Sequence, residues 1–426
     1  MTRIVVVGAG VGGLRAAEAL RAAGHDGELI VVGVEDRHPY QRPPLSKTLL
    51  AGGVEPDGLT IRRRKSVADV EWRLGTAVVR ADLDARVLQL ATPTGGDALI
   101  GDQLAWDGLV IATGLHSKRL NLPGSAAHRH AVRSLHDALE LRAELVPGAR
   151  LVIVGAGFLG CEIAATAVGL GCDVAVVAPE AEPMERQLGT LVGAAMRRRH
   201  EERGVRFHLG RLPLSLDPRG AGVALDDGTV LPADVVVEAV GSVPATEWLA
   251  GTGLDLTDGV LCDSWLRAVG STGPRADVVA VGDVARFPHP LAGPPARRIE
   301  HWDMPPLTAK RAAPALVAGL AGVALDPEPF APVPSFWSDQ YDVTIQSFGT
   351  PELADEVEVV EGHLRGPFLA AYRQSTPSGS RLVAAIGVGT MDGLLDLRAA
   401  LATGVTADVT ADVSSGPPVP GSHAAG

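Results

Sequence analysis

Residues 4–20 read IVVVGAGVGGLRAAEAL, and the fold class follows from this segment. Its apolar start predicts a buried strand, its glycines predict a tight turn, and its alanine-rich end predicts a helix. Gly8, Gly10 and Gly13 have the spacing of a dinucleotide-binding turn. In such a turn the first glycine allows the sharp bend, the second lets the backbone approach a pyrophosphate, and the third lets the helix pack closely on the strand.

The same unit occurs again further along the chain. Residues 151–165 read LVIVGAGFLGCEIAA, in which Gly155, Gly157 and Gly160 repeat the spacing, and an apolar strand follows at residues 174–177. A single glycine turn is a weak signal, but two copies that each follow an apolar run and begin a helix are specific. They predict two bound dinucleotides, a flavin dinucleotide (FAD) in one copy and a nicotinamide dinucleotide in the other.

The second strand of such a unit is normally followed by an acid that binds the ribose hydroxyls. Glu35 has this position in the first copy, although an ordinary strand-end acid is the alternative. In the second copy the strand is followed by Ala178, and the next acid is Glu180. Because Glu180 and two acids close behind it would repel a 2′-phosphate, we expect NADH as the coenzyme rather than NADPH. Arg186 is the residue that could reverse this preference.

Composition excludes several classes of protein. The chain has 426 residues and a formal net charge of −12, which argues against a protein that coats nucleic acid or an anionic membrane. No apolar run reaches the roughly 18 residues of a membrane span. The glycines that follow residues 4–7 would break a secretory signal, and Cys161, Cys172 and Cys262 cannot build a disulfide scaffold. We therefore expect a cytoplasmic protein.

Residues 38–47, HPYQRPPLSK, carry the most informative motif. Two adjacent prolines restrict the backbone to few conformations, which suits a wall against a flat ring. Here the chain resembles the FAD-dependent NAD(P)H:ferredoxin reductases, the putidaredoxin and rubredoxin reductase group, which feed electrons to bacterial oxygenases. The resemblance runs over residues 4–401 and implies that Arg42, Pro43 and Lys47 bind FAD along the isoalloxazine ring.

The resemblance also implies a catalytic pair. Glu162 lies two residues past the last glycine of the second copy, and in the family this acid pairs with the lysine of the first copy, here Lys47. The pair is expected near the flavin N5, where hydride arrives. A fixed ammonium group there favours the electron-rich reduced flavin, and the carboxylate holds the ammonium in place. Glu162 also fits a first-turn acid that the helix dipole favours.

Four shorter motifs complete the resemblance. The matching residues are Thr113 and Gly114 in ATG, Gly282 and Asp283 in VGDV, Glu300 and Trp302 in RIEHW, and Trp337 in FWSDQ. In the family, ATG crosses back past the FAD, and the aspartate of VGDV accepts hydrogen bonds from the ribityl hydroxyls. RIEHW lies beside the nicotinamide and the flavin pyrimidine, and the tryptophan of FWSDQ faces the flavin. By themselves Asp283 would fit a helix cap and Trp337 a core residue. We expect the remaining tryptophans in the core or on the surface: Trp72, Trp106, Trp248 and Trp265.

The chain departs from the family pattern just after RIEHW. Where the family has a helix of small residues, this chain has Asp303, Met304, Pro305 and Pro306. Proline is accepted in the first turn of a helix but donates no N–H. Any backbone hydrogen bond to the flavin from positions 305 or 306 is therefore absent, and we expect the redox tuning of the ring to differ.

We predict an α/β protein with two Rossmann-like dinucleotide-binding domains and a C-terminal antiparallel α+β interface domain. The predicted limits are 1–115 and 244–325 for a discontinuous FAD-binding domain, 116–243 for an NAD(P)H-binding domain, 326–405 for the C-terminal domain, and 406–426 for a disordered tail. In the C-terminal domain the predicted strands are residues 343–348, 356–360, 368–372 and 382–386, with a helix at residues 391–401.

The expected partner is a ferredoxin-type iron–sulfur protein. Ferredoxins are acidic, so a reductase with a net charge of −12 needs a local basic patch to dock one. The candidates are residues 62–65, the pair Arg297-Arg298 and the pair Lys310-Arg311, with ordinary solvated charges as the alternative. We expect no nucleic-acid or membrane partner, and the sequence leaves the oligomeric state open.

The predicted activity is that of an NAD(P)H:ferredoxin oxidoreductase, with Lys47, Glu162, Trp302 and Trp337 as catalytic residues. One alternative is an NAD(P)H oxidase, peroxidase or disulfide reductase on the same architecture. Such enzymes use a cysteine near the flavin after the first helix, where this chain has none. A second alternative is a redox-sensing flavoprotein with little turnover.

Overall fold

The apolar run at the start of the chain becomes an inner strand of a mostly parallel sheet in the computed structural model, which describes residues 2–94, 97–290, 293–377 and 379–402. The sheet order is β19-β20-β7-β1-β2-β3. Its strands are β1 (Arg3–Val7), β2 (Glu28–Val32), β3 (Glu71–Arg73), β7 (Gly108–Ile111), β19 (Arg267–Gly270) and β20 (Gly273–Ala280). Strands from both sides of the second unit thus share one sheet, as a discontinuous domain requires.

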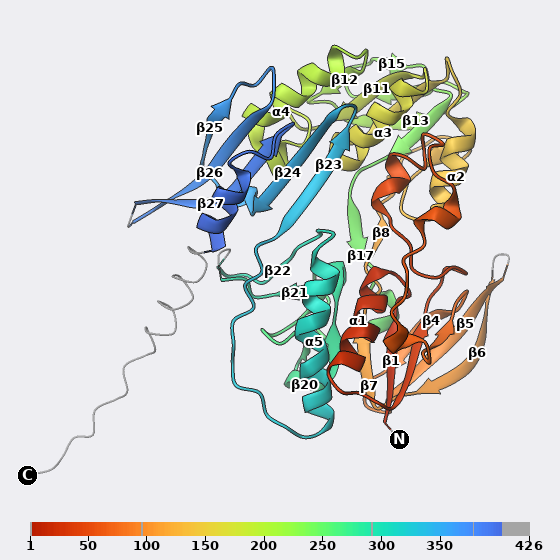
Figure 1. Ribbon diagram of the computed structural model, residues 1–426. Coiled ribbons are helices and arrows are strands. Elements are labelled where there is room, and N and C mark those ends of the chain that lie inside the picture. The colour runs from red at the N-terminus through yellow and green to blue at the C-terminus, as the bar shows by residue number, and fades with distance from the viewer. Residues whose placement is uncertain (1, 95–96, 291–292, 378, 403–426) are drawn as a thin grey trace, which may run out of the picture.

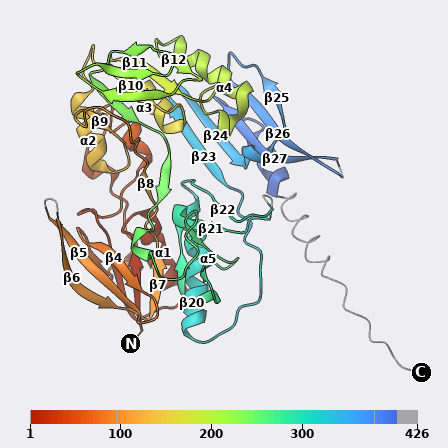
Figure 2. The same ribbon diagram turned by 180° about the vertical axis from the view of Figure 1, so that it is seen from behind.

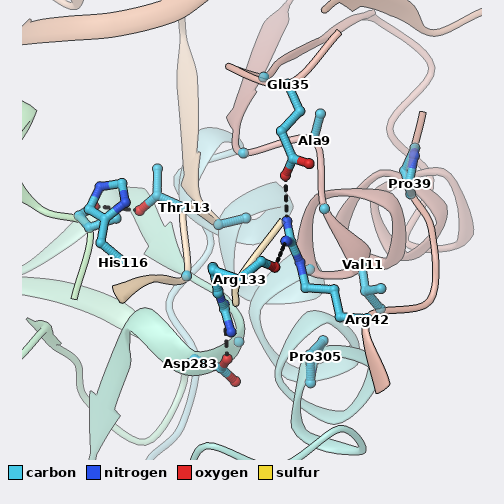
Figure 3. Close-up of a pocket in the computed structure, with 18 of the residues that line it drawn as sticks. Ala9, Val11, Glu35, Pro39, Arg42, Thr113, His116, Arg133, Asp283 and Pro305 are labelled. Carbon is cyan, nitrogen blue, oxygen red and sulfur yellow. Dashed lines mark hydrogen bonds and ion pairs between the residues drawn. The ribbon is translucent and has the colours of Figure 1, made fainter. Parts of the chain in front are cut away.

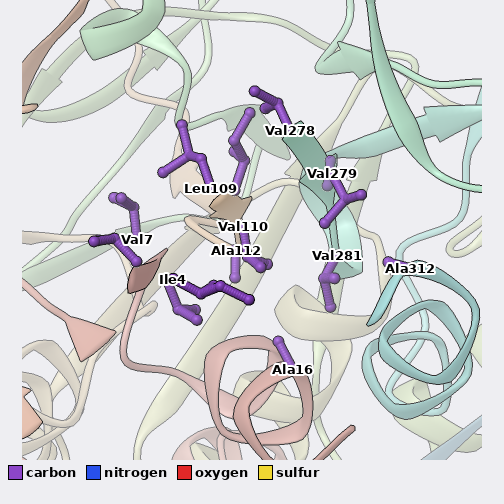
Figure 4. Packing of buried hydrophobic residues seen from close by; sticks show 14 of the residues in the cluster. Ile4, Val7, Ala16, Leu109, Val110, Ala112, Val278, Val279, Val281 and Ala312 are labelled. Carbon is purple, nitrogen blue, oxygen red and sulfur yellow. The ribbon is translucent and has the colours of Figure 1, made fainter. Parts of the chain in front are cut away.

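Two helices pack together against this sheet: α1 (Val11–Ala22) and α5 (Met304–Leu320). Figure 4 shows Ile4, Val110 and Val279 of the sheet on the side of Ala16 of α1 and Ala312 of α5. Small alanines on both helices allow close packing on the branched side chains of the strands. An antiparallel sheet completes the first unit, with β4 (Ala77–Asp82), β5 (Val87–Thr94) and β6 (Asp97–Ala105).

The second unit repeats this plan. A parallel sheet has the order β12-β11-β10-β16-β9, and its central strand β10 pairs with β11 and β16 as β1 pairs with β2 and β7. The strands are β9 (Arg129–His130), β10 (Arg150–Val154), β11 (Asp173–Ala178), β12 (Arg206–Leu209) and β16 (Val235–Glu238). The helices are α2 (Leu135–Glu144), α3 (Phe158–Gly169) and α4 (Glu185–Glu201). A small antiparallel sheet again follows, with β13 (Pro213–Asp217), β14 (Gly222–Leu225) and β15 (Val230–Leu231).

Two antiparallel strands cross between the two units, β8 (Leu115–Ser117) and β17 (Ser242–Pro244), and both views show them running from one unit to the other. We propose the predicted limits at 115/116, 243/244 and 325/326 as the domain boundaries, because the first two fall within this crossing. A further small sheet of the first unit contains β18 (Val260–Leu261), β21 (Ala285–Phe287) and β22 (Arg297–Arg298).

The C-terminal part is an antiparallel sheet of order β23-β24-β27-β26-β25, followed by helical residues 394–402. The strands are β23 (Ser335–Gln340), β24 (Val343–Gly349), β25 (Glu356–Gly362), β26 (Phe368–Thr376) and β27 (Gly379–Val388). Four of these were predicted, and the fifth, β23, is the FWSDQ segment itself. Both views place this sheet beside α4 and away from β4–β6. The predicted tail, residues 406–426, lies outside the described residues.

The C-terminal sheet shares its core with the second unit. Met184 and Leu188 at the start of α4 lie in one buried cluster with Phe336, Ile345 and Tyr372 of the sheet. The strand that carries FWSDQ is therefore fixed against the helices that follow the second glycine turn. Among the described residues, no helix is long and apolar enough to cross a membrane.

Candidate active site

A cavity of about 780 Å³ lies where the glycine turn of the first unit meets α3 of the second unit and β23. Its walls come from all three parts of the chain, and Figure 3 shows several of the lining side chains. Most of the predicted site residues line it: Gly8, Gly10, Glu35, Arg42, Pro43, Lys47, Thr113, Gly114, Glu162, Gly282, Asp283, Glu300, Trp302 and Trp337.

The three glycines of the first turn have three different surroundings. Gly8 has a φ of 115°, and a Cβ on it would collide with the carbonyl oxygen of Ala112. A Cβ on Gly13 would collide with the carbonyl oxygen of Gly8, so this glycine lets α1 pack on the turn. Gly10 instead has no atom within 4 Å of its Cβ position and lines the cavity. A methyl group there would occupy space that a ligand needs.

The second turn repeats these surroundings outside the cavity. Gly155 has a φ of 108° and a Cβ position blocked by Ala239, while that of Gly160 is blocked by Gly155. The Cβ position of Gly157 is open. Gly155, Gly157 and Gly160 follow β10, and Glu180 lies just past β11. None of these four predicted site residues lines the cavity of the first turn. Each unit thus has one turn glycine with an open Cβ position and two whose Cβ positions are blocked by the fold.

Lys47 and Glu162 meet inside the cavity. The Lys47 Nζ lies 2.8 Å from the Glu162 Oε2. Ser46 donates to the same oxygen at 2.6 Å, and Ser338 of β23 donates to Oε1 at 2.7 Å. Glu162 is 7% exposed, so its charge is held by these donors and by the ammonium rather than by water. The ammonium is fixed in turn, since it also donates to the carbonyl oxygen of Pro43 at 3.2 Å.

Glu35 also lines the cavity. Its carboxylate accepts a hydrogen bond from the Tyr40 hydroxyl at 2.5 Å and pairs with Arg42 at 2.6 Å (Figure 3). Each carboxylate oxygen keeps a further lone pair for a ribose hydroxyl. Arg42 also donates to the carbonyl oxygen of Arg133 at 2.5 Å, so this arginine joins the first unit to the second.

Arg133 is a site residue that the sequence did not reveal. It lines the cavity from the loop before α2, and its guanidinium lies 3.7 Å from the carboxylate of Asp283 (Figure 3). Burial raises the pKa of Asp283 to about 6, while the Arg133 charge opposes that rise. No motif marks Arg133, which only precedes the capping box of Ser134 and Asp137.

The remaining wall is aromatic and proline-rich. Trp302 and Trp337 line the cavity, as does Trp248, which was expected in the core or on the surface. Trp248 is 7% exposed, and its indole N–H has no hydrogen-bond partner in the described part of the chain. Glu300, also in the wall, pairs with Arg298 at 2.6 Å and accepts from Ser242 at 3.0 Å.

The start of α5 faces the cavity without a free backbone donor. Met304 donates its N–H to the carbonyl oxygen of His301 at 3.0 Å, and Leu307 donates to that of Asp303 at 3.4 Å. Between them stand Pro305 and Pro306, which have no N–H. Because Pro305 lines the cavity, the helix offers its dipole to a ligand here but no hydrogen bond.

These features fit a bound FAD. A cavity of about 780 Å³ is within the range of about 300–1,000 Å³ that ligand pockets occupy. The open Cβ position of Gly10 and the unpartnered indole N–H of Trp248 are what a dinucleotide would fill and bind. Arg42 and Arg133 supply positive charge for a pyrophosphate beside the first glycine turn.

Among the described residues, no thiol group lines this cavity. The three cysteines of the chain are buried and free, and none of them lines it. Burial raises the pKa of Cys161 and Cys262, which makes both thiols poor nucleophiles. In the described residues, no group of three or more His, Cys, Asp or Glu side chains could hold a metal ion. The disulfide-reductase alternative therefore lacks its reactive group.

Two dinucleotide turns, a cavity between their units and a buried Lys–Glu pair inside it define a flavin-dependent pyridine nucleotide oxidoreductase. Residues 2–304 match the family model described as pyridine nucleotide-disulphide oxidoreductase, and residues 335–415 match the model described as reductase C-terminal. The chain belongs to this family and is an FAD-dependent oxidoreductase.

Individual relatives are similar to this protein over most of the chain. The ferredoxin–NAD(+) reductase component of an anthranilate 1,2-dioxygenase system from Burkholderia cepacia is 36% identical over 417 residues, 95% of each chain. Putidaredoxin reductase CamA from Pseudomonas putida is 32% identical over 380 residues, 87% of this chain and 85% of that one. A crystal structure of a covalent putidaredoxin reductase–putidaredoxin complex matches with a TM-score of 0.82 and 28% identity, covering 97% and 99% of the two chains.

Proposed function

We propose that this protein oxidises NADH and reduces a ferredoxin-type iron–sulfur protein that serves an oxygenase. The observation that carries the proposal is the Lys47–Glu162 pair, 2.8 Å apart in a cavity built by both dinucleotide units and by β23. The named partners of the relatives, and the presence of a putidaredoxin in one matching structure, support it. We propose the cytoplasm as its location, because NADH is available there and all three cysteines are free.

Each part of the site has a distinct task. When bound, FAD supplies the redox chemistry by accepting two electrons as hydride and releasing them singly. Arg42, Arg133 and the first glycine turn bind its pyrophosphate, and Asp283 accepts hydrogen bonds from its ribityl chain. Lys47 places a fixed positive charge beside the ring, and Glu162 orients that charge. Trp302 and Trp337 wall off the ring, which excludes water from the reacting face.

The composition of the cofactor tests this assignment. The purified protein should be yellow, and denaturation should release FAD in a ratio of about one per chain, as expected if this cavity holds one FAD. Anaerobic NADH should bleach the flavin absorbance. A protein that stays colourless and cannot be reconstituted with FAD would refute the proposal.

Glu180 is proposed to determine the preference for NADH. It lies just past β11, and its carboxylate pairs with Arg186 at 3.1 Å. Glu180→Ala should raise the ratio of kcat/KM for NADPH to that for NADH about tenfold, because it removes a repulsive charge and frees Arg186 for a 2′-phosphate.

Asp173 provides the matched control for Glu180. It lies at the other end of β11 and pairs with Arg206 at 2.5 Å. Asp173→Ala should leave the coenzyme ratio unchanged. An unchanged ratio in Glu180→Ala as well would remove Glu180 from the coenzyme site.

Pro305 is proposed to lower the flavin potential. Pro305→Ala restores an N–H at the start of α5 that has no partner within the helix. A donor beside the pyrimidine would stabilise the negative charge of reduced flavin, so the midpoint potential should rise by about 20–30 mV. This shift corresponds to the net free energy of one hydrogen bond in a two-electron reduction. Pro314→Ala, in the same helix but outside the cavity wall, is the control. Equal potentials in both variants would contradict this role.

Two arginines of the predicted basic patch are paired with acids. Arg298 pairs with Asp258 and Glu300, and Arg311 pairs with Glu328 and stacks on Trp265. These two arginines are therefore largely neutralised and only about a tenth exposed. We propose that docking relies on the exposed members of the predicted patch, which are Arg297, Lys310 and residues 62–65.

A further inference from the structure

Strand β23 presents two different faces. Ser338 and Gln340 are each 1% exposed and point toward α3 and α4, whereas Trp337 and Asp339 alternate with them on the outer face. The family resemblance assigns a role to Trp337, and the inward residues are left without one. They are polar side chains in a cluster that is otherwise apolar, and burying polar groups there costs free energy unless every one is paired.

The inward residues form a continuous hydrogen-bond chain that ends on Glu162. Ser338 donates its hydroxyl to Glu162 Oε1 at 2.7 Å. Gln340 donates its Nε2 to the Ser338 hydroxyl at 3.1 Å and also contacts the sulfur of Met184. His200 of α4, which is fully buried, lies with Nε2 at 2.8 Å from Gln340 Oε1. Three elements of two domains thus contribute to one chain.

The direction of every bond in this chain is determined. The Gln340 Oε1 can only accept, so the proton of His200 must be on Nε2. Burial lowers the pKa of His200 to about 4, so the ring is neutral and its Nδ1 accepts from the Tyr341 hydroxyl at 2.9 Å. All donors therefore point toward the carboxylate of Glu162.

The two carboxylate oxygens of Glu162 have separate partners. Oε2 receives Lys47 and Ser46 from the first unit, and Oε1 receives Ser338 from the C-terminal domain. Without the Ser338 bond, the carboxylate could rotate about its last side-chain torsion, which has a broad minimum. The ammonium of Lys47 would then lose its fixed position.

We propose that Ser338, Gln340 and His200 are positioning residues that hold Glu162, and through it Lys47, in place for reduction of the flavin by NADH. The inference rests on the proposed function of the Lys47–Glu162 pair. It gives the C-terminal domain a part in the reaction with NADH, besides any part in contact with the electron acceptor.

Two variants of the FAD-loaded full-length protein test the proposal. Ser338→Ala removes the donor to Oε1. Gln340→Glu keeps the shape but supplies a second carboxylate, which competes with Glu162 for the hydroxyl of Ser338. Asp339→Asn is the matched control, because Asp339 is on the outer face and contacts only Thr344 among the described side chains. Anaerobic stopped-flow reduction over a range of NADH concentrations separates the limiting rate constant from the apparent Kd for NADH.

The limiting rate constant should fall about tenfold in Ser338→Ala and in Gln340→Glu, as expected for loss of a hydrogen bond to a charged group. The apparent Kd for NADH should stay within about twofold, and the flavin midpoint potential should fall, because the positive charge beside the ring is no longer fixed. Asp339→Asn should match the parent in all three values.

Parental rate constants and potentials in both variants would overturn the proposal. Loss of FAD from both variants, with Asp339→Asn still loaded, would also overturn it, since the network would then serve folding alone. Failure of the proposed function gives a different result, because the parent protein itself would not be reduced by NADH.

Discussion

Replacing Lys47 by methionine should slow the reduction of the bound flavin by NADH about a hundredfold. Methionine keeps the length of the side chain and removes the charge, so Glu162 loses its cation in a cavity where it is 7% exposed. Removing one preorganised electrostatic partner from a reaction centre typically costs about 10²–10³ in rate. A buried carboxylate without its counterion is also destabilising, so a loss of thermal stability should accompany the slower rate.

Anaerobic single-turnover reduction measures this effect directly, because it excludes the later transfer to an acceptor. Lys310→Met is the control, since Lys310 is an exposed lysine in α5 that does not line the cavity. It should reduce at the parental rate. A Lys47→Met protein that binds FAD and is reduced as fast as the parent would show that the ammonium has no role in the reaction with NADH.

Alanine at the middle glycine of each turn should separate the two cofactors. Gly10→Ala should fold but bind FAD about a hundredfold more weakly, because its methyl group enters open space in the cavity and overpacking costs about 1–3 kcal/mol. Gly157→Ala should keep FAD and raise the KM for NADH by a similar factor, since its Cβ position is open in the second turn.

The two variants are controls for each other, and flavin content with NADH titration measures both. Gly13→Ala adds a third comparison. Its Cβ would collide with the Gly8 carbonyl oxygen, so we expect misfolding rather than a clean loss of affinity. If Gly10→Ala retained FAD with parental affinity, or if Gly157→Ala lost it, the assignment of one dinucleotide to each unit would be wrong.

The sequence was sufficient to predict the features that depend on residues close together in the chain. The glycine turns depend on residues within a few positions of one another, so their spacing predicts both sheets and both turns. The pairing of Lys47 and Glu162 could be predicted only through the family motifs, because the two residues lie 115 positions apart in the chain. The structure places them 2.8 Å apart.

The sequence was insufficient to predict contacts between side chains of different domains. Arg133 reaches Asp283 from the second unit, and no pattern near it marks that contact. Trp248 lies in the buried core, as expected, but the sequence did not reveal that it also lines the cavity. FWSDQ was interpreted through its tryptophan alone, and alternation along β23 assigns Ser338 and Gln340 to the opposite face. A basic residue in a sequence does not reveal its counterion, so the ion pairs of Arg298 and Arg311 could not be predicted.

The most direct test of the function follows the electrons after the flavin is reduced. The protein is reduced anaerobically with one equivalent of NADH and mixed in separate experiments with an oxidised ferredoxin and with air-saturated buffer. A ferredoxin–NAD(+) reductase should pass its electrons to two equivalents of ferredoxin per flavin, much faster than oxygen reoxidises it. Rapid transfer to oxygen with none to any ferredoxin would favour an oxidase. A reduced complex that persists with both acceptors would favour a redox sensor, and either result would contradict the function proposed for this protein.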